Sequence, residues 1–455
     1  MLPEPASKDA VVDQPSTTKV DASGLNGDLL AFCAACGGYS PRMIRILHTS
    51  DWHLGHTLHD LSRRHEHAEF LSWLLDRLED EQVDALIVAG DIFDTANPSA
   101  DAQQTLYKFL AEARRRIKHL DIIFIGGNHD SAARLDAPDP LLRAFNIRIV
   151  GGLPRTGGRV DYDRVILPVG GRDGAIGAWV AAVPFLRAFD LPSVAGDDPL
   201  VNGVRQVYAE VFADLRARRE PGQALVAVGH CYMVGTQLSE LSERKILGGN
   251  QHALPVDIFP EDIAYVALGH LHRAQCIGGR EHIRYSGSPI PLSMTEAPYT
   301  HEVRIVELDG EKLVSTRSLP IPRVVPFLKI PADRPRPLDE VLTLLAALPA
   351  ATTDAFDPTR PYLEVDVVLT KPTPSLRDSI DKAVAGKAAR LVRIGVTLEG
   401  SGAALADAFT TKSLSELLPE QVFRECYRRT YPGDPPDDML ASFSDLLDCV
   451  SAEAP

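Results

Sequence analysis

The chain has 455 residues, a length that predicts roughly two to four domains. Hydrophobic residues make up 45% and charged residues 24%, as in a globular protein that can bury a core. No run of about 18 apolar residues occurs, which excludes a membrane-spanning helix. The formal net charge of −15 argues against nucleic-acid binding, because phosphate contacts need clustered lysine and arginine. Bound divalent cations, a local basic patch or a partner subunit can override that overall sign.

The first 42 residues lack the pattern of a folded segment. Residues 1–23 are rich in proline, serine and aspartate and show no apolar periodicity. The apolar stretch at 29–36 is too short for the core of a secretory signal. Met43 immediately precedes the first strand pattern, so we expect residues 1–42 to be a disordered or spurious extension.

Strand and helix patterns alternate from Met43 onward. Helical spacing of apolar residues occurs at 67–80 and 100–118. Strands are predicted at 44–47, 85–89, 122–125, 178–183, 224–228, 265–268 and 283–286. A β-hairpin is predicted at 302–308 and 312–318, turning at Asp309-Gly310. This order indicates a mixed-sheet α/β body with two packed sheets and helices outside.

A proline-rich passage that begins at Pro320 marks the best domain boundary. Beyond it, helices are predicted at 338–348 and 375–384 and strands at 362–369 and 390–398. The capping-box pattern Ser413-x-x-Glu416 opens a helical end of the chain. The sequence therefore predicts a body at 43–320, a small α/β domain at 321–405 and a C-terminal helical segment at 406–455.

Polar side chains follow five of the predicted strands. Because the carboxyl ends of strands in an open α/β sheet meet at one edge, these side chains should lie close together. Individually, Asp91 could be a helix N-cap, Asn128 a turn former and His230 a hydrogen-bonded core histidine. Their joint occurrence at five strand ends favours one metal site. The candidate ligands are Asp51, His53, Asp91, Asn128, His230, His270 and His272.

The chemistry of these ligands narrows the metal. Carboxylate, amide oxygen and imidazole without thiolate suit Mn²⁺, Fe²⁺ or Zn²⁺ in a mixed site. Seven ligands are too many for one ion and suit two ions that share a bridging carboxylate. Such a pair of divalent ions is a device for in-line attack on phosphorus.

These motifs resemble those of the calcineurin-like metallophosphoesterase family, and longer strings are similar to its SbcD branch of bacterial nuclease subunits. The strings lie at 46–55, 267–275 and 285–293, and the resemblance is strong over 43–318. It implies a two-sheet β-sandwich flanked by helices, followed by a small α/β capping domain and C-terminal helices.

The resemblance also implies a role for each candidate residue. One ion would be held by Asp51, His53 and His272, and the second by Asn128, His230 and His270, with Asp91 bridging. His129 would sit over the scissile phosphate, where it would stabilise negative charge or protonate the leaving oxygen, an acid role that suits imidazole. The alternative is a histidine that only supports the ligands. Asp130 is expected to orient His129 or to cap a helix.

The function implied by the resemblance is that of a Mn²⁺-dependent double-stranded DNA exonuclease and single-stranded DNA endonuclease in DNA repair. The expected partners are DNA and an SbcC-type coiled-coil ATPase, with a homodimer inside a heterotetramer. The C-terminal helices would dock on that ATPase or, alternatively, pack within the chain. Few, scattered cysteines fit a reducing compartment, and a cytoplasmic, nucleoid-associated location is expected.

Two other functions remain open on this fold. One is a small-substrate phosphodiesterase, because fold and metal site do not fix the substrate. The other is a scaffold protein that has lost catalysis. The residues that would contact DNA are harder to identify. Arg63, Arg64 and Arg134 follow the predicted catalytic loops and could reach phosphate. Arg114, Arg115 and Arg116 lie near the end of a helix, where complementing the helix dipole explains them about as well as DNA binding does.

Overall fold

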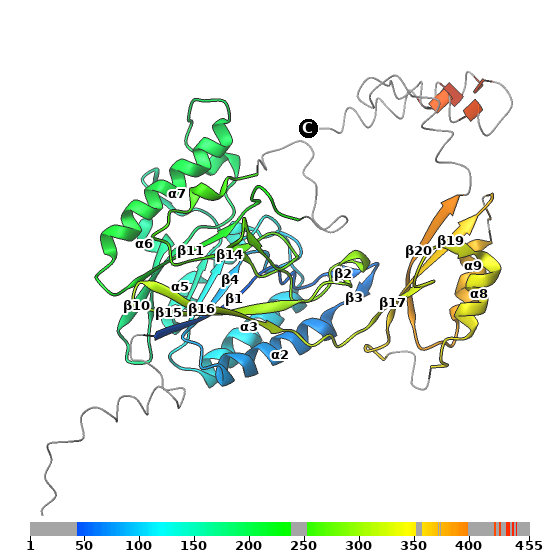
Figure 1. Cartoon of the computed structure of the whole chain (residues 1–455), viewed down its shortest axis with the longest axis horizontal. Coiled ribbons are helices and arrows are strands. Elements are labelled where there is room, and N and C mark those ends of the chain that lie inside the picture. The colour runs from blue at the N-terminus through cyan, green and yellow to red at the C-terminus, as the bar shows by residue number, and fades with distance from the viewer. Residues whose placement is uncertain are drawn as a thin grey trace, which may run out of the picture. The chain divides into compact units, whose positions relative to one another are not determined.

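The computed structural model describes residues 43–237, 253–351, 357–371, 373, 375–398, 423–424, 427–428, 434–436, 439–440 and 443. The chain divides into two compact units after Val324 (Figure 1). The extension predicted at 1–42 and most of the predicted C-terminal segment lie outside the described residues. The domain boundaries proposed from the sequence remain predictions.

The first unit contains two six-stranded sheets. In the first sheet four parallel strands adjoin an antiparallel hairpin, which confirms the hairpin predicted at Asp309-Gly310. Its strands, in spatial order, are β16 (Lys312–Pro320), β15 (Glu302–Asp309), β1 (Met43–Thr49), β4 (Ala85–Ala89), β5 (Asp121–Ile125) and β6 (Ile147–Val150).

The second sheet has parallel strands at its centre and antiparallel strands at both edges. Its order is β13 (Gln275–Ile277), β14 (Arg280–Tyr285), β12 (Tyr265–Gly269), β11 (Ala224–His230), β10 (Ile176–Ala182) and β9 (Ile166–Gly170). Two short hairpins complete the strands of this unit, β2 (Thr57–Leu58) with β3 (Leu61–Ser62) and β7 (Arg155–Thr156) with β8 (Arg159–Val160).

Helices cover the outer faces of both sheets. The long ones are α2 (Arg64–Asp80) and α3 (Ala100–Arg116) on the first sheet and α7 (Pro199–Arg218) on the second (Figure 1). The short ones are α4 (Ala132–Asp136), α5 (Asp139–Leu142), α6 (Tyr162–Val165), η1 (Arg143–Phe145), η2 (Ala188–Asp190), η3 (Val256–Ile258) and η4 (Met294–Glu296).

Apolar strands explain this layering. Residues such as Ile46 and Ile87 from one sheet and Val180 and Val226 from the other form an apolar core between the sheets. Strands that are apolar on both faces need cover on both, so the helices pack outside. The predicted fold class, a two-sheet sandwich flanked by helices, is confirmed.

Helix α7 was not predicted from the sequence. It begins with the side chain of Asp198 accepting the backbone N–H of Val201, with Pro199 in its first turn. Val207, Val211 and other apolar residues recur along its buried face. The cap, the proline and the spacing were together a sufficient signal for a helix at this place.

The parallel strands of both sheets bring their carboxyl ends to one place. At the end of β11, Nδ1 of His230 donates to the carbonyl of Ala89 at the end of β4, 2.8 Å away. A loop between β10 and α7 starts from the same edge, because Val183 N–H donates to Val228 O. The loops that follow these strands therefore share one edge of the sandwich.

The second unit is a small parallel sheet with two helices. In it β19 (Tyr362–Leu369) pairs with β17 (Phe327–Ile330), β18 (Arg336–Pro337) and β20 (Arg390–Leu398). Its helices are α8 (Leu338–Ala346) and α9 (Leu376–Val384), and they pack on β19 and β20. The helices and strands predicted for this region are confirmed.

Little of the C-terminal segment is described. Phe423 and Phe443, both in the predicted helical segment, are helical, and the centroids of their stacked rings lie 4.2 Å apart. The remainder of that prediction falls outside the described residues. Within the described part of the chain, no helix combines the length and apolarity needed to cross a membrane.

Candidate metal centre

Strained backbone marks the shared strand edge. Eight non-glycine residues among those described have positive φ, and four of them are the predicted ligands Asp51, His53, Asp91 and His270. Such conformations are unfavourable for residues with a Cβ and persist where the surroundings impose them. Here backbone bonds do so, since Asp51 N–H donates to Gly90 O and His53 N–H to Asp91 O, both at 3.0 Å. The first and second strand ends are thus locked together.

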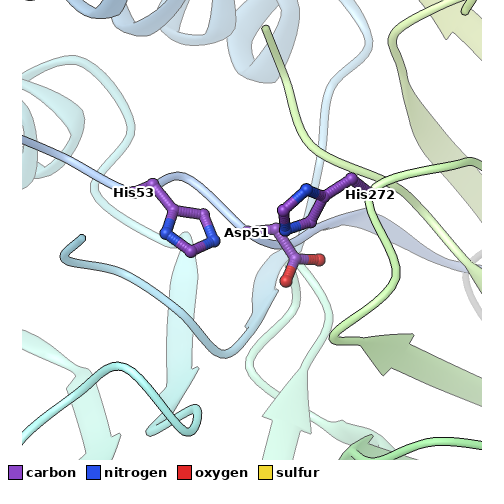
Figure 2. Close-up of side chains that lie close together, drawn as sticks. All are labelled: Asp51, His53 and His272. Carbon is purple, nitrogen blue, oxygen red and sulfur yellow. The ribbon is translucent and has the colours of Figure 1, made fainter. Parts of the chain in front are cut away.

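Asp51, His53 and His272 form the first cluster (Figure 2). They come from the ends of β1 and β12, and their ligand atoms lie within 4.8 Å of one another. His53 is 2% exposed, and neither of its ring nitrogens has a hydrogen bond. Only the carboxylates of Asp94 and Asp91 approach these nitrogens, at 3.3 and 3.6 Å. Buried polar atoms normally find a hydrogen-bond partner, so an imidazole without one inside an Asp/His cluster fits a metal ligand.

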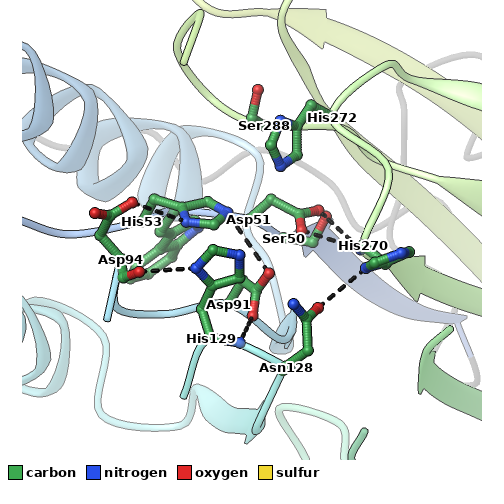
Figure 3. Close-up of polar contacts among 12 residues, drawn as sticks. Ser50, Asp51, His53, Asp91, Asp94, Asn128, His129, His270, His272 and Ser288 are labelled. Carbon is green, nitrogen blue, oxygen red and sulfur yellow. Dashed lines mark hydrogen bonds and ion pairs between the residues drawn. The ribbon is translucent and has the colours of Figure 1, made fainter. Parts of the chain in front are cut away.

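Asp91 lies between the two predicted ligand sets. Its Oδ2 is 3.6 Å from Nε2 of His53 and 3.4 Å from Nε2 of His230. Its Oδ1 accepts the backbone N–H of His129 at 2.8 Å, which fixes the carboxylate (Figure 3). One carboxylate oxygen therefore faces an imidazole from each set, a position from which Asp91 could bridge two ions.

Asn128, His230 and His270 form the second cluster. Oδ1 of Asn128 lies 3.0 Å from Nε2 of His230 and 3.0 Å from Nδ1 of His270. The backbone N–H of His270 donates to Oδ1 of Asp51 at 3.0 Å, which ties this cluster to the first. All seven predicted ligands thus converge at the shared strand edge.

Two of the imidazoles are oriented by hydrogen bonds on the far side of the ring. His230 uses Nδ1 to bond Ala89 O, and His272 uses Nδ1 to bond Oε1 of Glu296 at 2.8 Å. In both, Nε2 is left for the site, which is how ligating histidines are usually held. Glu296 is fully buried and was not singled out from the sequence.

The buried carboxylates of the cluster need positive charge close to them. Burial alone would lower the pKa of His230, but the Asp91 and Asp51 carboxylates outweigh it and raise this pKa to about 9. For Asp91, burial opposes ionisation, yet the neighbouring His230 and His53 hold its pKa well below the usual value. Burial lowers the pKa of His270 to about 3 and keeps it neutral. Bound cations would supply the charge that the proton on His230 supplies here.

Asp94 is a residue of the site that was left without a role in the sequence-based prediction. Its Oδ1 lies 3.3 Å from Nδ1 of His53 and 3.0 Å from Nδ1 of His56. Its backbone carbonyl accepts from Nδ1 of His129 at 2.8 Å (Figure 3). The carbonyl bond turns Nε2 of His129 toward the cluster. Its position three residues after Asp91 was the one available signal.

Two expectations about neighbouring residues are wrong. Asp130 neither contacts the ring of His129 nor caps a helix, because its carboxylate accepts the backbone N–H groups of Ile92, Phe93 and Gly127. Arg63 does not reach outward to phosphate, since it is fully buried and bonds Glu66 and the carbonyl of Pro291.

The helix-end arginines serve the fold. Arg114 donates to three backbone carbonyls at the end of α3, while Arg115 and Arg116 pair with Glu112. These contacts suit the helix-end role, and a role in DNA binding stays a prediction for Arg115, whose side chain is 71% exposed. Arg134 is exposed, and Arg64 pairs with Asp101 on the surface.

An αββα sandwich with carboxylates, imidazoles and an amide at its strand ends is the arrangement of a calcineurin-like phosphoesterase. The family model of that description matches residues 44–274. A second model, the type 5 capsule protein repressor C-terminal domain, matches residues 323–431. The class predicted from the sequence is confirmed.

Comparison with curated relatives identifies the branch of this class to which the chain is similar. The chain is 40% identical over 392 residues to the SbcD subunit of the SbcCD nuclease of Rhodobacter capsulatus, covering 84% of this chain and 94% of that protein. It is 38% identical over 298 residues to the SbcD protein of Escherichia coli K12, covering 64% and 71%. The counterpart from Bacillus subtilis is 39% identical over 266 residues, covering 58% and 66%.

The chain therefore belongs to the SbcD family of calcineurin-like phosphoesterases. It is accordingly an enzyme of the metal-dependent phosphodiesterase and nuclease class, a hydrolase that acts on ester bonds.

Proposed function

We propose that the chain is a Mn²⁺-dependent DNA nuclease that cleaves phosphodiester bonds with two metal ions. It would act as an exonuclease on double-stranded DNA and an endonuclease on single strands. The observation that carries the two-ion proposal is Asp91 Oδ2, which faces His53 on one side and His230 on the other at 3.6 and 3.4 Å. A single ion would not need ligands on both sides of that oxygen.

The donors divide into two sets around Asp91. Asp51, His53 and His272 would hold one ion, and Asn128, His230 and His270 the other. Mixed oxygen and nitrogen donors without thiolate suit Mn²⁺. When bound, the ions would polarise the phosphoryl oxygens and lower the pKa of a water molecule that attacks phosphorus.

His129 would be the catalytic acid. Its Nδ1 bonds the carbonyl of Asp94, so Nε2 is the nitrogen that would face the reacting phosphate. A proton given from Nε2 to the departing oxygen would complete the cleavage of the ester bond. His53 packs edge-on against this ring at a centroid distance of 4.8 Å and restricts its tilt.

The partner proposal follows from the family. We propose that the chain works with an SbcC-type coiled-coil ATPase, as a homodimer in a heterotetramer, in the cytoplasm. The unit after Val324 would cap or position DNA, and the C-terminal helices would bind the ATPase. Similarity to proteins that carry the SbcCD name over most of their length supports this assembly.

One assay tests the proposed activity. Purified protein with Mn²⁺ is given linear double-stranded DNA and, separately, the small diester bis(p-nitrophenyl) phosphate. We expect both to be cleaved. His129→Ala should slow DNA cleavage at least about a hundredfold and the small diester far less, because p-nitrophenolate departs without a proton from an acid. If the small diester is cleaved while DNA stays intact, with and without the ATPase, the chain is a small-substrate phosphodiesterase. If neither is touched, it is a scaffold.

A further inference from the structure

An exposed aromatic side chain stands on a turn of the loop that follows β10. Phe189 in η2 is 80% exposed, more than any other large hydrophobic side chain in the described part of the chain. Exposing a phenylalanine to this extent forgoes the gain from burying it. A side chain held out in this way suggests a contact with something outside the chain.

The turn that carries Phe189 is held firmly on both sides. Leu186 and Leu191 pack on the core of the second sheet, and the backbone N–H of Arg187 donates to Oδ2 of Asp190 at 2.8 Å. The carbonyl of Asp190 accepts from Arg155 at 2.6 Å. Phe189 therefore projects from a fixed support rather than from a loose loop.

The same loop is attached to the catalytic loops. Phe185 N–H donates to Gly126 O at 2.8 Å, and the ring of Phe185 lies 6.2 Å from the ring of His230. Arg187 donates to the carbonyl of Asp130 at 3.0 Å, directly after His129 in the chain. The loop leaves the carboxyl end of β10, at the strand edge that carries the ligands, and its bond to Asp130 lies two residues before Phe189.

We propose that Phe189 stacks on a nucleobase of the substrate that is unpaired next to the scissile phosphodiester. This proposal rests on the proposed nuclease function and deepens it. An aromatic ring can stack on any base, so the contact would be independent of sequence. The cationic Arg187 of this turn and Arg155 of β7, which donates to the turn, add attraction for the adjoining phosphates.

The contact would favour DNA ends and single strands. A base inside a duplex is already stacked on its neighbours, whereas a frayed or unpaired base offers a free face. Phe189 would therefore hold the strand end open while the phosphate sits at the metal centre. A protein partner is the other class of molecule that could cover this side chain, and the test separates the two.

The test compares Phe189→Ala and Phe189→Trp with Phe145→Ala in the full-length, Mn²⁺-loaded protein. Phe145 is a matched control, because it is 52% exposed and lies at the amino end of β6, whereas the ligands follow the carboxyl ends of the strands. Initial rates are measured on a duplex with a splayed end and on bis(p-nitrophenyl) phosphate. Quenching of 2-aminopurine at the splayed end reports stacking directly.

We expect Phe189→Ala to slow DNA cleavage roughly five- to a hundredfold and to abolish the quenching. The rate of Phe189→Ala on the small diester should match that of the wild type. Phe189→Trp and Phe145→Ala should cleave DNA at the wild-type rate. Unchanged DNA cleavage and quenching in Phe189→Ala would overturn the proposal. So would a loss seen only when the ATPase is present, which would assign Phe189 to a protein contact. Failure of the wild type to cleave any DNA would instead refute the proposed function.

Discussion

Replacing Glu296 with glutamine tests how the chain orients one of its proposed ligands. Oε1 of Glu296 accepts from Nδ1 of His272 at 2.8 Å, and Oε2 accepts the backbone N–H of Leu292 at 2.7 Å. Both Glu296 and His272 are buried. The carboxylate thus satisfies two donors at once, and it fixes the proton of His272 on Nδ1.

Glutamine keeps the shape but has only one oxygen. If that oxygen stays on the N–H of Leu292, the amide NH₂ group faces Nδ1 of His272 and needs an acceptor there. The proton of His272 then moves to Nε2, the nitrogen that would bind the ion. We expect Mn²⁺ affinity to fall roughly 10- to 100-fold, which corresponds to about 1.4 to 2.7 kcal/mol.

Isothermal titration of the full-length protein with Mn²⁺ measures this change. Glu307→Gln is the matched control, because Glu307 also carries an ion pair, with Arg45, but lies on β15 away from the strand ends. The reasoning fails if Glu296→Gln and Glu307→Gln bind Mn²⁺ with the same affinity as the wild type.

Three further changes probe the site and its support. A Cβ on Gly127 would lie 2.1 Å from Oδ1 of Asp91 and displace this carboxylate. Gly127→Ala should therefore reduce hydrolysis of the small diester at least about a hundredfold, while the circular dichroism spectrum stays native. Activity within a fewfold of wild type would contradict this. Asp94→Asn keeps the backbone carbonyl but removes the charge beside His53, so kcat should fall roughly tenfold with KM nearly unchanged; a change in KM alone would argue against a positioning role. Burial lowers the pKa of His48 from 6.5 to about 3, so between these pH values the unfolded chain binds a proton at His48 that the folded chain does not bind. Stability should therefore fall as pH drops below about 6.5, by about 1.4 kcal/mol per pH unit from this residue, and His48→Gln should flatten that slope in urea unfolding; an equal slope in both proteins would refute it.

Strand positions and strand-end residues were predictable because they obey local rules. The run at 85–89 is apolar throughout, and Asp91 follows it after a single glycine, so strand and candidate ligand are both predicted from a few residues. The convergence of distant ends also followed, since parallel strands present their carboxyl ends together. The two clusters around Asp91 lie where that rule puts them.

Residues that act through the fold were not predictable in this way. Glu296 lies in a short turn after β14 and reaches His272 only because the chain folds back across the strand ends. Arg63 has the pattern of an exposed cation in the sequence, yet it is buried against Glu66 in the three-dimensional structure. The projection of Phe189 depends on packing on either side of its turn. Such contacts come from tertiary structure, and no spacing in the sequence encodes them.

The central claim is a pair of divalent ions bridged by Asp91, and crystals grown with Mn²⁺ test it most directly. Anomalous scattering should show two peaks on either side of the Asp91 carboxylate. One is expected among Asp51, His53 and His272 and the other among Asn128, His230 and His270. A single peak, or an ion held by His53, Asp94 and His129 instead, would contradict the account.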